Sequence, residues 1–346
     1  MSYEVRAGTI GRTTIAVSDL VKVFRVARHH RGVVGAFRNL VTGEYREVRA
    51  VDGISFTIRG GEMVGCIGPN GAGKSTTIKM LTGILVPTSG HIEVDGLVPD
   101  RRRREVARRI GVVFGQRTQL WWDLPLVESL DLLRYIYRIP AGRYQENLDQ
   151  FRELLELDAF LSTPVRQLSL GQRMRGDLAA ALLHDPAIVY LDEPTIGLDV
   201  VAKHRIRGFL RQINRDRGVT VLMTTHDVAD LEQLCARLLI IDHGKLLYDG
   251  GLEEMRANFG EERTLVVDLA DEIAGEAPGP LDVPRAREVR ADGPRRWLRF
   301  SRTEVTATDL IAAVTTRYRV QDISIEEPEI EEIIRRIYEE GLVLHA

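Results

Sequence analysis

The sequence of 346 residues predicts an α/β fold: a largely parallel sheet flanked by helices, an antiparallel layer of strands at one edge, and a small α+β module at the C-terminal end. Short apolar runs alternate with longer helical patterns through most of the chain, which is typical of βαβ units. The first apolar runs lack intervening helical patterns, and the composition changes near Glu261. These three observations define the expected layers.

The predicted strands fall into two groups. The first strands, at 13–17 and 51–58, are expected to pair antiparallel at the edge of the fold. The basic, partly amphipathic segment 26–49 between them is either a partner-binding surface or an extended hairpin loop with a short helix. Continuous apolar runs predict strands that are buried on both faces. These runs are residues 63–67, 188–191, 219–223 and 238–241.

A second, smaller domain is expected after residue 260. Residues 274–284 are rich in Gly, Pro and acidic side chains and predict a loop. Strand-like alternation occurs at 264–269 and 297–301, and helical spacing occurs at 306–316 and 328–339. We therefore expect a first domain of residues 1–260 and a small α+β module of residues 261–346, in which no catalytic constellation is visible.

Composition argues against several classes of function. The 47 basic and 50 acidic side chains leave a formal net charge of -3, which gives no electrostatic reason to expect a nucleic-acid partner. The basic run at residues 101–104, with Arg108 and Arg109, is interpreted as a solvated helix face. Cys66 and Cys235 lack metal-ligand spacing and suit a reducing cytosol. Neither a signal peptide nor a membrane-spanning stretch is expected, so a transport role would require another polypeptide to supply the channel.

A phosphate-binding loop is predicted directly after the buried run at 63–67. Residues 68–76 read Gly-Pro-Asn-Gly-Ala-Gly-Lys-Ser-Thr and match G-x-x-x-x-G-K-[ST], followed by an amphipathic helical pattern. The glycines let backbone N–H groups converge on phosphate oxygens, and the helix N-terminus favours an anion. Lys74 would reach the terminal phosphates, and the Ser75 hydroxyl would ligate Mg²⁺. The predicted binding residues are Gly68, Asn70, Gly71, Ala72, Gly73, Lys74, Ser75 and Thr76.

Two carboxylates and a histidine follow later strands. Asp192 ends the apolar run at 188–191 and is placed to hold Mg²⁺, whereas Glu193 would face an attacking water and orient or deprotonate it. The next run leads to His226, which can bond the γ-phosphate or hold the water and Glu193 in register. His243 lies in a hairpin turn and is interpreted as structural.

The chain resembles the nucleotide-binding subunits of ABC transporters over roughly residues 13–248. The deciding motif is Leu-Ser-Leu-Gly-Gln at 168–172, which is similar to the family's signature sequence and lies between the phosphate loop and Asp192. The resemblance implies a P-loop NTPase core of ABC type with a helical signature subdomain at about 118–183. It also implies that Ser169, Gly171 and Gln172 close over the γ-phosphate held by the opposite subunit. Leu170 stands where the family most commonly has glycine.

Other positions match the family in order. Gln116 is similar to the glutamine that senses Mg²⁺ and the attacking water, and Asp199 lies in the loop that communicates across the dimer. Phe24 occupies the place of the aromatic that stacks on adenine, with Tyr45 as the alternative. Residues 121–125, Trp-Trp-Asp-Leu-Pro, together with 126–137, would either line the groove that receives a permease helix or form subdomain core.

The resemblance implies an ATPase that uses ATP and Mg²⁺, pairs with a second ATPase subunit as a homodimer, and sits at the cytoplasmic face of the membrane on separate permease subunits. The paired tryptophans, Leu170 and the C-terminal module resemble the drug- and viologen-export branch. Two alternatives stay open: a soluble ABC ATPase acting on ribosomes or DNA, and an importer ATPase with a regulatory C-terminal domain. The transported substrate is not encoded in these motifs.

Overall fold

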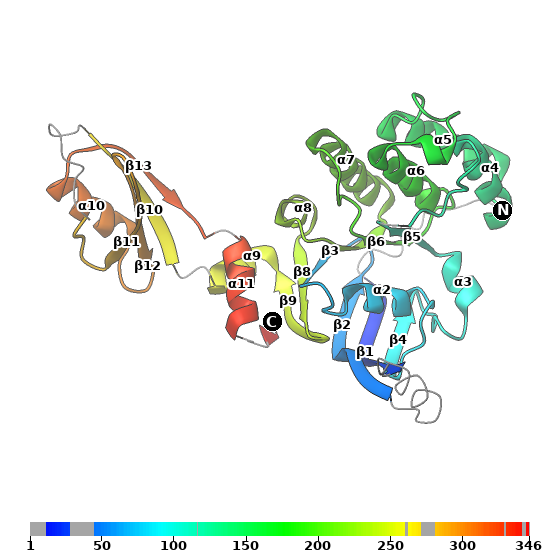
Figure 1. Ribbon diagram of the computed structural model, residues 1–346, viewed down its shortest axis with the longest axis horizontal. Coiled ribbons are helices and arrows are strands. Elements are labelled where there is room, and N and C mark those ends of the chain that lie inside the picture. The colour runs from blue at the N-terminus through cyan, green and yellow to red at the C-terminus, as the bar shows by residue number, and fades with distance from the viewer. Residues whose placement is uncertain are drawn as a thin grey trace, which may run out of the picture. The chain divides into compact units, whose positions relative to one another are not determined.

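The computed structural model describes residues 12–27, 45–115, 117–259, 262–270, 281–328, 330–340 and 344–345. The chain divides into two compact units, one of Met1–Gly250 with Val343–Ala346 and one of Gly251–Leu342 (Figure 1). The α/β prediction with an antiparallel edge layer and a C-terminal α+β module is confirmed.

The first unit is built on a seven-stranded sheet in the order β14-β9-β8-β3-β7-β6-β5. Its central strands pair in parallel, as the continuous apolar runs predicted. Every residue of β7 is buried, and in β6 only Asp192 at the carboxyl end is partly exposed. The strands are β3 (Met63–Ile67), β5 (Ile110–Phe114), β6 (Ile188–Asp192), β7 (Thr220–Thr224), β8 (Arg237–Asp242), β9 (Lys245–Gly251) and β14 (Leu344–His345).

A three-stranded antiparallel layer, in the order β2-β1-β4, forms the edge of this unit. Its strands are β1 (Thr13–Ala27), β2 (Tyr45–Arg59) and β4 (Ser89–Val94). The pairing of β1 with β2 continues out to Ala27 opposite Tyr45. The prediction of loop or helix was therefore wrong at residues 26–27 and 45–49; residues 28–44 lie outside the described part of the chain. The first residues of β2, from Tyr45 on, are exposed, so they show no apolar alternation that would identify them as a strand.

Helices cover the sheet and form a separate helical layer. The helices of the first unit are α2 (Lys74–Leu81), α3 (Arg103–Ala107), α4 (Leu126–Tyr137), α5 (Ala141–Leu155), the 3₁₀ turn η1 (Val165–Gln167), α6 (Leu170–Leu182), α7 (Val200–Arg217) and α8 (Val228–Leu234). Helices α4, α5 and α6 gather beside α7 (Figure 1). Leu126, Phe151 and Leu178 are fully buried among them. No helix in the described residues is long and apolar enough to cross a bilayer.

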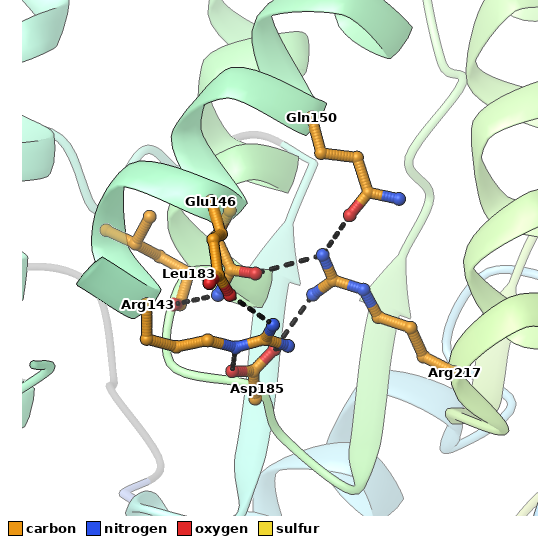
Figure 2. Close-up of polar contacts among 7 residues, drawn as sticks. Arg143, Glu146, Gln150, Leu183, Asp185 and Arg217 are labelled. Carbon is orange, nitrogen blue, oxygen red and sulfur yellow. Dashed lines mark hydrogen bonds and ion pairs between the residues drawn. The ribbon is translucent and has the colours of Figure 1, made fainter. Parts of the chain in front are cut away.

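A polar cluster joins the helical layer to α7. The Arg217 guanidinium, at the last residue of α7, donates to Asp185 Oδ1 at 2.8 Å and to Asn147 Oδ1 at 2.9 Å, and also contacts Gln150 (Figure 2). Arg143 of α5 donates to the other oxygen of Asp185 through Nε at 2.6 Å. Because Asp185 lies between α6 and β6, this cluster ties α5 and α7 to the chain that enters the central sheet.

The second unit contains a four-stranded antiparallel sheet in the order β11-β12-β10-β13. Its elements are α9 (Leu252–Phe259), β10 (Glu262–Leu269), β11 (Ala286–Asp292), β12 (Arg295–Ser301), α10 (Ala307–Arg317), β13 (Val320–Glu326) and α11 (Ile330–Glu340). One face of the sheet packs on α10 through a cluster that includes Leu265, Leu298, Leu310 and Val314. The sequence prediction missed β11 and β13, whose side chains are mostly exposed and carry little apolar alternation.

Candidate functional site

The phosphate-loop motif connects β3 to α2, and two of its glycines are required by close backbone contacts. Gly73 precedes α2 with φ of 110°, and a Cβ there would lie 2.4 Å from the Ala50 carbonyl oxygen. A Cβ on Gly68 would lie 2.1 Å from the Ile241 carbonyl oxygen. Neither distance is compatible with a side chain, so the loop is packed directly against β2 and β8.

The Lys74 side chain is held by backbone carbonyl groups of this loop. The side chain is buried, and Nζ donates to the carbonyl oxygens of Gly68 at 2.6 Å and Pro69 at 3.0 Å. Burial lowers the pKa of Lys74, and the nearby carboxylates of Glu193 and Asp192 oppose that shift. A buried ammonium whose partners in the described part of the chain are backbone carbonyl oxygens is suited to exchange them for the oxygens of a phosphate.

Asp192, at the carboxyl end of β6, meets the phosphate loop. Ser75 Oγ donates to Asp192 Oδ1 at 3.0 Å, and Thr224 Oγ1 from the end of β7 donates to the same oxygen at 2.6 Å. The structure therefore brings together two of the three residues that the sequence predicted as metal ligands; the third, Gln116, lies outside the described residues. Thr224 was not assigned a role from sequence, although its position at the carboxyl end of a buried strand, next to the one that ends in Asp192, was a usable signal.

Glu193 and His226 meet beside this pair. His226 Nε2 lies 2.8 Å from Glu193 Oε1, and both side chains are partly exposed. Glu193 adopts a positive φ of 57°, which is uncommon outside glycine and re-aims its side chain away from the strand. Its N–H donates to the Thr224 carbonyl oxygen at 3.0 Å, which fixes that turn. The two side chains line a cleft of about 390 Å³, together with Thr195, Ile196, Gly197, Lys203, Thr225 and Asp227.

The signature motif forms the N-terminus of α6. Ser169 caps the helix: its Oγ accepts from the Gln172 N–H at 3.2 Å, and its own N–H donates to Gln172 Oε1 at 2.9 Å. Ser169 is exposed, and in the described residues no hydrogen bond or ion pair joins it to the phosphate loop. Gly171, two residues later, lies near Ala202 of α7. Asp199 caps that helix, because its Oδ1 accepts from the Ala202 N–H at 2.8 Å.

Of the remaining predicted residues, the structure describes Phe24 and its alternative Tyr45 but not Gln116. Phe24 lies on β1 opposite Val48, is half-buried, and has Lys22 Nζ 5.3 Å from its ring centroid. Tyr45, its alternative, begins β2 and is 62% exposed. Gln116 lies outside the described residues.

Sequence reasoning missed a buried carboxylate that holds the segment following Gln116. Asp177 of α6 is 4% exposed, and its Oδ1 accepts from Thr118 Oγ1 at 2.8 Å and from the Gln119 N–H at 3.1 Å. Burial raises the pKa of Asp177 to about 6, and the two hydrogen bonds only partly offset this. Nothing in the local sequence distinguishes this aspartate from the solvated acids of other helices.

The paired tryptophans are surface residues. Trp121 is 38% exposed and Trp122 50% exposed, and the Trp122 ring has the Arg173 guanidinium 5.7 Å from its centroid. The following helix α4 adds Tyr135 and Ile136, which are also largely exposed. The interpretation of the tryptophans as subdomain core is therefore wrong, because their rings stay accessible at the start of the helical layer.

These features define an ATP-binding cassette, and comparison with known proteins agrees. The family pattern described as ABC transporter matches residues 51–196. The ATP-binding protein NatA of Bacillus subtilis is 34% identical over 60% of this chain and 84% of its own length. The Nod factor export ATP-binding protein I of Ralstonia nicotianae is 35% identical over 68% of this chain and 76% of its own. The daunorubicin resistance ATP-binding protein DrrA3 of Streptomyces coeruleorubidus is 31% identical over 84% and 91%.

Solved structures resemble this chain in the same way. An ATP-binding subunit of an ABC transporter matches with a TM-score of 0.60 at 27% identity, covering 72% of this chain and 94% of its own. A dimeric ATP-binding cassette in a post-hydrolysis state with ADP and Pi matches at 0.57 and 25% identity, covering 69% and 98%. The chain belongs to the ABC transporter ATP-binding proteins and is an ATPase subunit of that family.

Proposed function

We propose that two copies of this chain close head-to-tail around two ATP molecules and that this closure drives separate permease subunits in export. The observation that carries the proposal is the convergence of Lys74, Ser75, Asp192, Glu193 and His226 at the carboxyl ends of β3, β6 and β7. This is the edge of a parallel sheet where ligands bind. The Nod factor export protein supports the export role by its name, and the daunorubicin resistance protein is named for resistance to a drug, which is compatible with export.

The residues present fit a Mg²⁺ ion between Ser75 and Asp192. A hydroxyl and a carboxylate oxygen 3.0 Å apart are the hard ligands that Mg²⁺ prefers, and the remaining positions would be taken by phosphate oxygens and water. Within the described ranges there is no group of three or more His, Cys, Asp and Glu that could form a protein-only cage. The ion would supply neutralisation of phosphate charge, and Gln116 is proposed to sense it.

The chemistry is assigned to the side chains around the 2.8 Å contact. Glu193 would orient or deprotonate the attacking water, and His226 would hold that carboxylate in place and reach the γ-phosphate. Lys74 would leave the loop carbonyls for the terminal phosphates. Phe24 is proposed to stack on adenine, because it is half-buried within the paired part of β1. Tyr45 instead belongs to the last pair of the β1–β2 ladder, opposite Ala27.

A second subunit is supported by surfaces that one chain leaves open. Ser169 is exposed, the first residues of α6 are partly exposed, and a helix N-terminus of this length favours an anion. Val200 and Val201, next to Asp199 at the start of α7, are 82% and 65% exposed. A dimer in which Ser169, Gly171 and Gln172 face the partner's ATP would use these groups, and the dimeric state of the similar cassette above supports the pairing of two such chains.

Dimer formation can be tested with three variants and size-exclusion chromatography coupled to light scattering. Glu193→Gln should bind ATP, hydrolyse it very slowly and accumulate a dimer when ATP and Mg²⁺ are added. Lys74→Ala should lose tight ATP binding and stay unpaired. Ser169→Arg in the Glu193→Gln background should still bind ATP but fail to pair. An ATP-dependent dimer that survives Ser169→Arg, or a Glu193→Gln variant with wild-type turnover, contradicts the proposal.

Attachment to a permease is proposed to use the exposed side chains of Trp121 and Trp122, together with Tyr135 and Ile136 of the following helix α4. Exposed aromatic side chains favour protein interfaces. Association there would hold the chain peripherally at the cytoplasmic face of the membrane. A related solved cassette is described as part of an ABC transporter complex, which supports assembly with other subunits. Trp122→Ala should reduce recovery of the chain with permease-containing membranes while ATP binding stays unchanged; equal recovery refutes the assignment.

A further inference from the structure

A buried carboxylate lies beneath the cleft that Glu193 and His226 line. Asp230, in α8, is 0% exposed. Its Oδ1 accepts from the Arg207 guanidinium of α7, and its Oδ2 accepts from the hydroxyl of Thr195 and from Thr225 Oγ1 at 3.3 Å. The two oxygens therefore face different parts of the fold: one faces a helix and the other faces two loop hydroxyls.

Those two threonines belong to the two segments that carry the proposed chemistry. Thr195 lies in the turn that follows Glu193, and Thr225 directly precedes His226. Both are nearly fully buried. The Thr225 hydroxyl donates to Asp230 and also accepts the N–H of Asp227 at 3.0 Å, so its donor and acceptor capacities are both used. One carboxylate oxygen thus fixes the separation of the two chain segments whose side chains meet at 2.8 Å.

Helix α7 holds the other oxygen of Asp230. The Arg207 side chain is only 10% exposed, and one turn earlier on the same helix Lys203 pairs with Asp227, the residue after His226. A buried ion pair is weak evidence for stability, because desolvation of both charges offsets their attraction. Two threonines aimed at the same carboxylate indicate instead that the group fixes local geometry. Since Asp199 caps the N-terminus of α7, the proposed dimer-facing loop is joined to the same helix.

We propose that Asp230 and Arg207 are positioning residues for ATP hydrolysis, which act by holding the Glu193 and His226 segments at a fixed separation through Thr195 and Thr225. This inference rests on the roles proposed above for Glu193 and His226. Neither Asp230 nor Arg207 lines the cleft, and their effect passes through the two threonine hydroxyls. ATP binding, which depends on the phosphate loop, is independent of them.

Isosteric removal of each hydroxyl tests the inference in the full-length chain. Thr195→Val and Thr225→Val should each lower kcat by about 10- to 100-fold, the scale expected when a reacting group is misplaced by about 1 Å. The affinity for ATP, measured by equilibrium binding, should not change. Thr195→Ser retains the hydroxyl and should keep wild-type kcat. The matched control is Thr220→Val, a buried threonine at the opposite end of β7 whose hydroxyl accepts from the Gly61 N–H at 3.0 Å. It should lose stability but keep its kcat.

A double-mutant comparison separates positioning from general destabilisation. In the Glu193→Gln background the group to be positioned has gone, so adding Thr195→Val should leave the residual rate within about twofold. An equal fold-loss in both backgrounds, or wild-type kcat in both threonine variants, overturns the inference. If Glu193→Gln alone turns over at the wild-type rate, the proposed function fails instead. If Glu193→Gln is slow while the valine variants are normal, only the positioning role fails.

Discussion

The buried Asp177 carboxyl provides a pH-dependent prediction about the junction between α6 and the segment after residue 116. Replacing Asp177 by Asn keeps a carbonyl oxygen at the Oδ1 position, where both Thr118 and Gln119 donate. It removes the charge that burial disfavours. Because the two hydrogen bonds survive and the unfavourable charge does not, Asp177→Asn should be more stable than the natural chain wherever the natural carboxyl is ionised.

The magnitude follows from the shift in pKa. Burial raises the pKa of Asp177 from 3.8 to about 6. A shift of roughly 2 units corresponds to about 3 kcal/mol at ~1.4 kcal/mol per unit. The sign follows from proton linkage: the folded chain binds the proton more tightly than the unfolded chain, so this contribution to stability is complete below pH 3.8 and is lost as the pH rises through about 6. Asp177→Asn should therefore gain up to about 3 kcal/mol over the natural chain at pH 8, and little at pH near 4.

Urea unfolding of both proteins across this pH range measures the difference directly. Burial lowers the pKa of His184 to about 4, so its own contribution to stability is lost as the pH falls. Both proteins contain His184, and its effect cancels in the difference. Thr118→Val provides a second test, because removing the donating hydroxyl should raise the pKa of Asp177 further. The stability gained by adding Asp177→Asn to Thr118→Val should therefore appear at a higher pH than it does in the natural chain. A difference between Asp177→Asn and the natural chain that stays flat across the range would refute the reasoning.

Three further predictions concern other parts of the first unit. Gly73→Ala should abolish ATP binding and lower the melting temperature, because its φ of 110° and a Cβ 2.4 Å from a carbonyl oxygen of β2 leave no room for a side chain. Phe24→Ala should weaken ATP affinity by about 1–3 kcal/mol, the usual worth of one stacked base, whereas Tyr45→Ala should leave equilibrium binding unchanged. Arg217→Ala should cost about 2 kcal/mol in urea unfolding, because the buried Asn147 side-chain oxygen loses its charged donor, while the exposed Asp185 keeps Arg143 as a partner; a loss below about 0.5 kcal/mol would contradict the cluster's role.

The sequence predicted the parts of the site that are local in the chain. The phosphate loop, Asp192 and His226 could be located because each follows a continuous apolar run, and the carboxyl ends of parallel strands meet at one edge of a sheet. That rule also anticipated the contact between Ser75 and Asp192, although its 3.0 Å geometry required the folded chain. The α/β class and the antiparallel edge layer followed from the same alternation of patterns.

The supporting contacts could not be predicted, because they depend on distant residues with ordinary local surroundings. Asp230 is one acid among several in its segment, and only the fold shows that it meets Arg207 and Thr195. The strands β11 and β13 were not predicted for a different reason. Both lie at the edges of their sheet, so their mostly exposed side chains carry no periodic apolar signal. Patterns reveal buried elements, whereas pairings between charged side chains and edge strands need the three-dimensional context.

Leu170 illustrates how a departure from the usual signature is accommodated. A glycine at this place would suggest a need for unusual backbone geometry, but Leu170 is the first residue of α6 and both capping hydrogen bonds of Ser169 are formed beside it. Its side chain instead lies toward Gly197, where an added Cβ would be 3.0 Å from Leu170 Cδ2 and φ is 70°. The leucine thus fills the space that Gly197 leaves open. The signature helix and the turn before Asp199 are therefore in packing contact within one chain, so a displacement of either should be felt by the other.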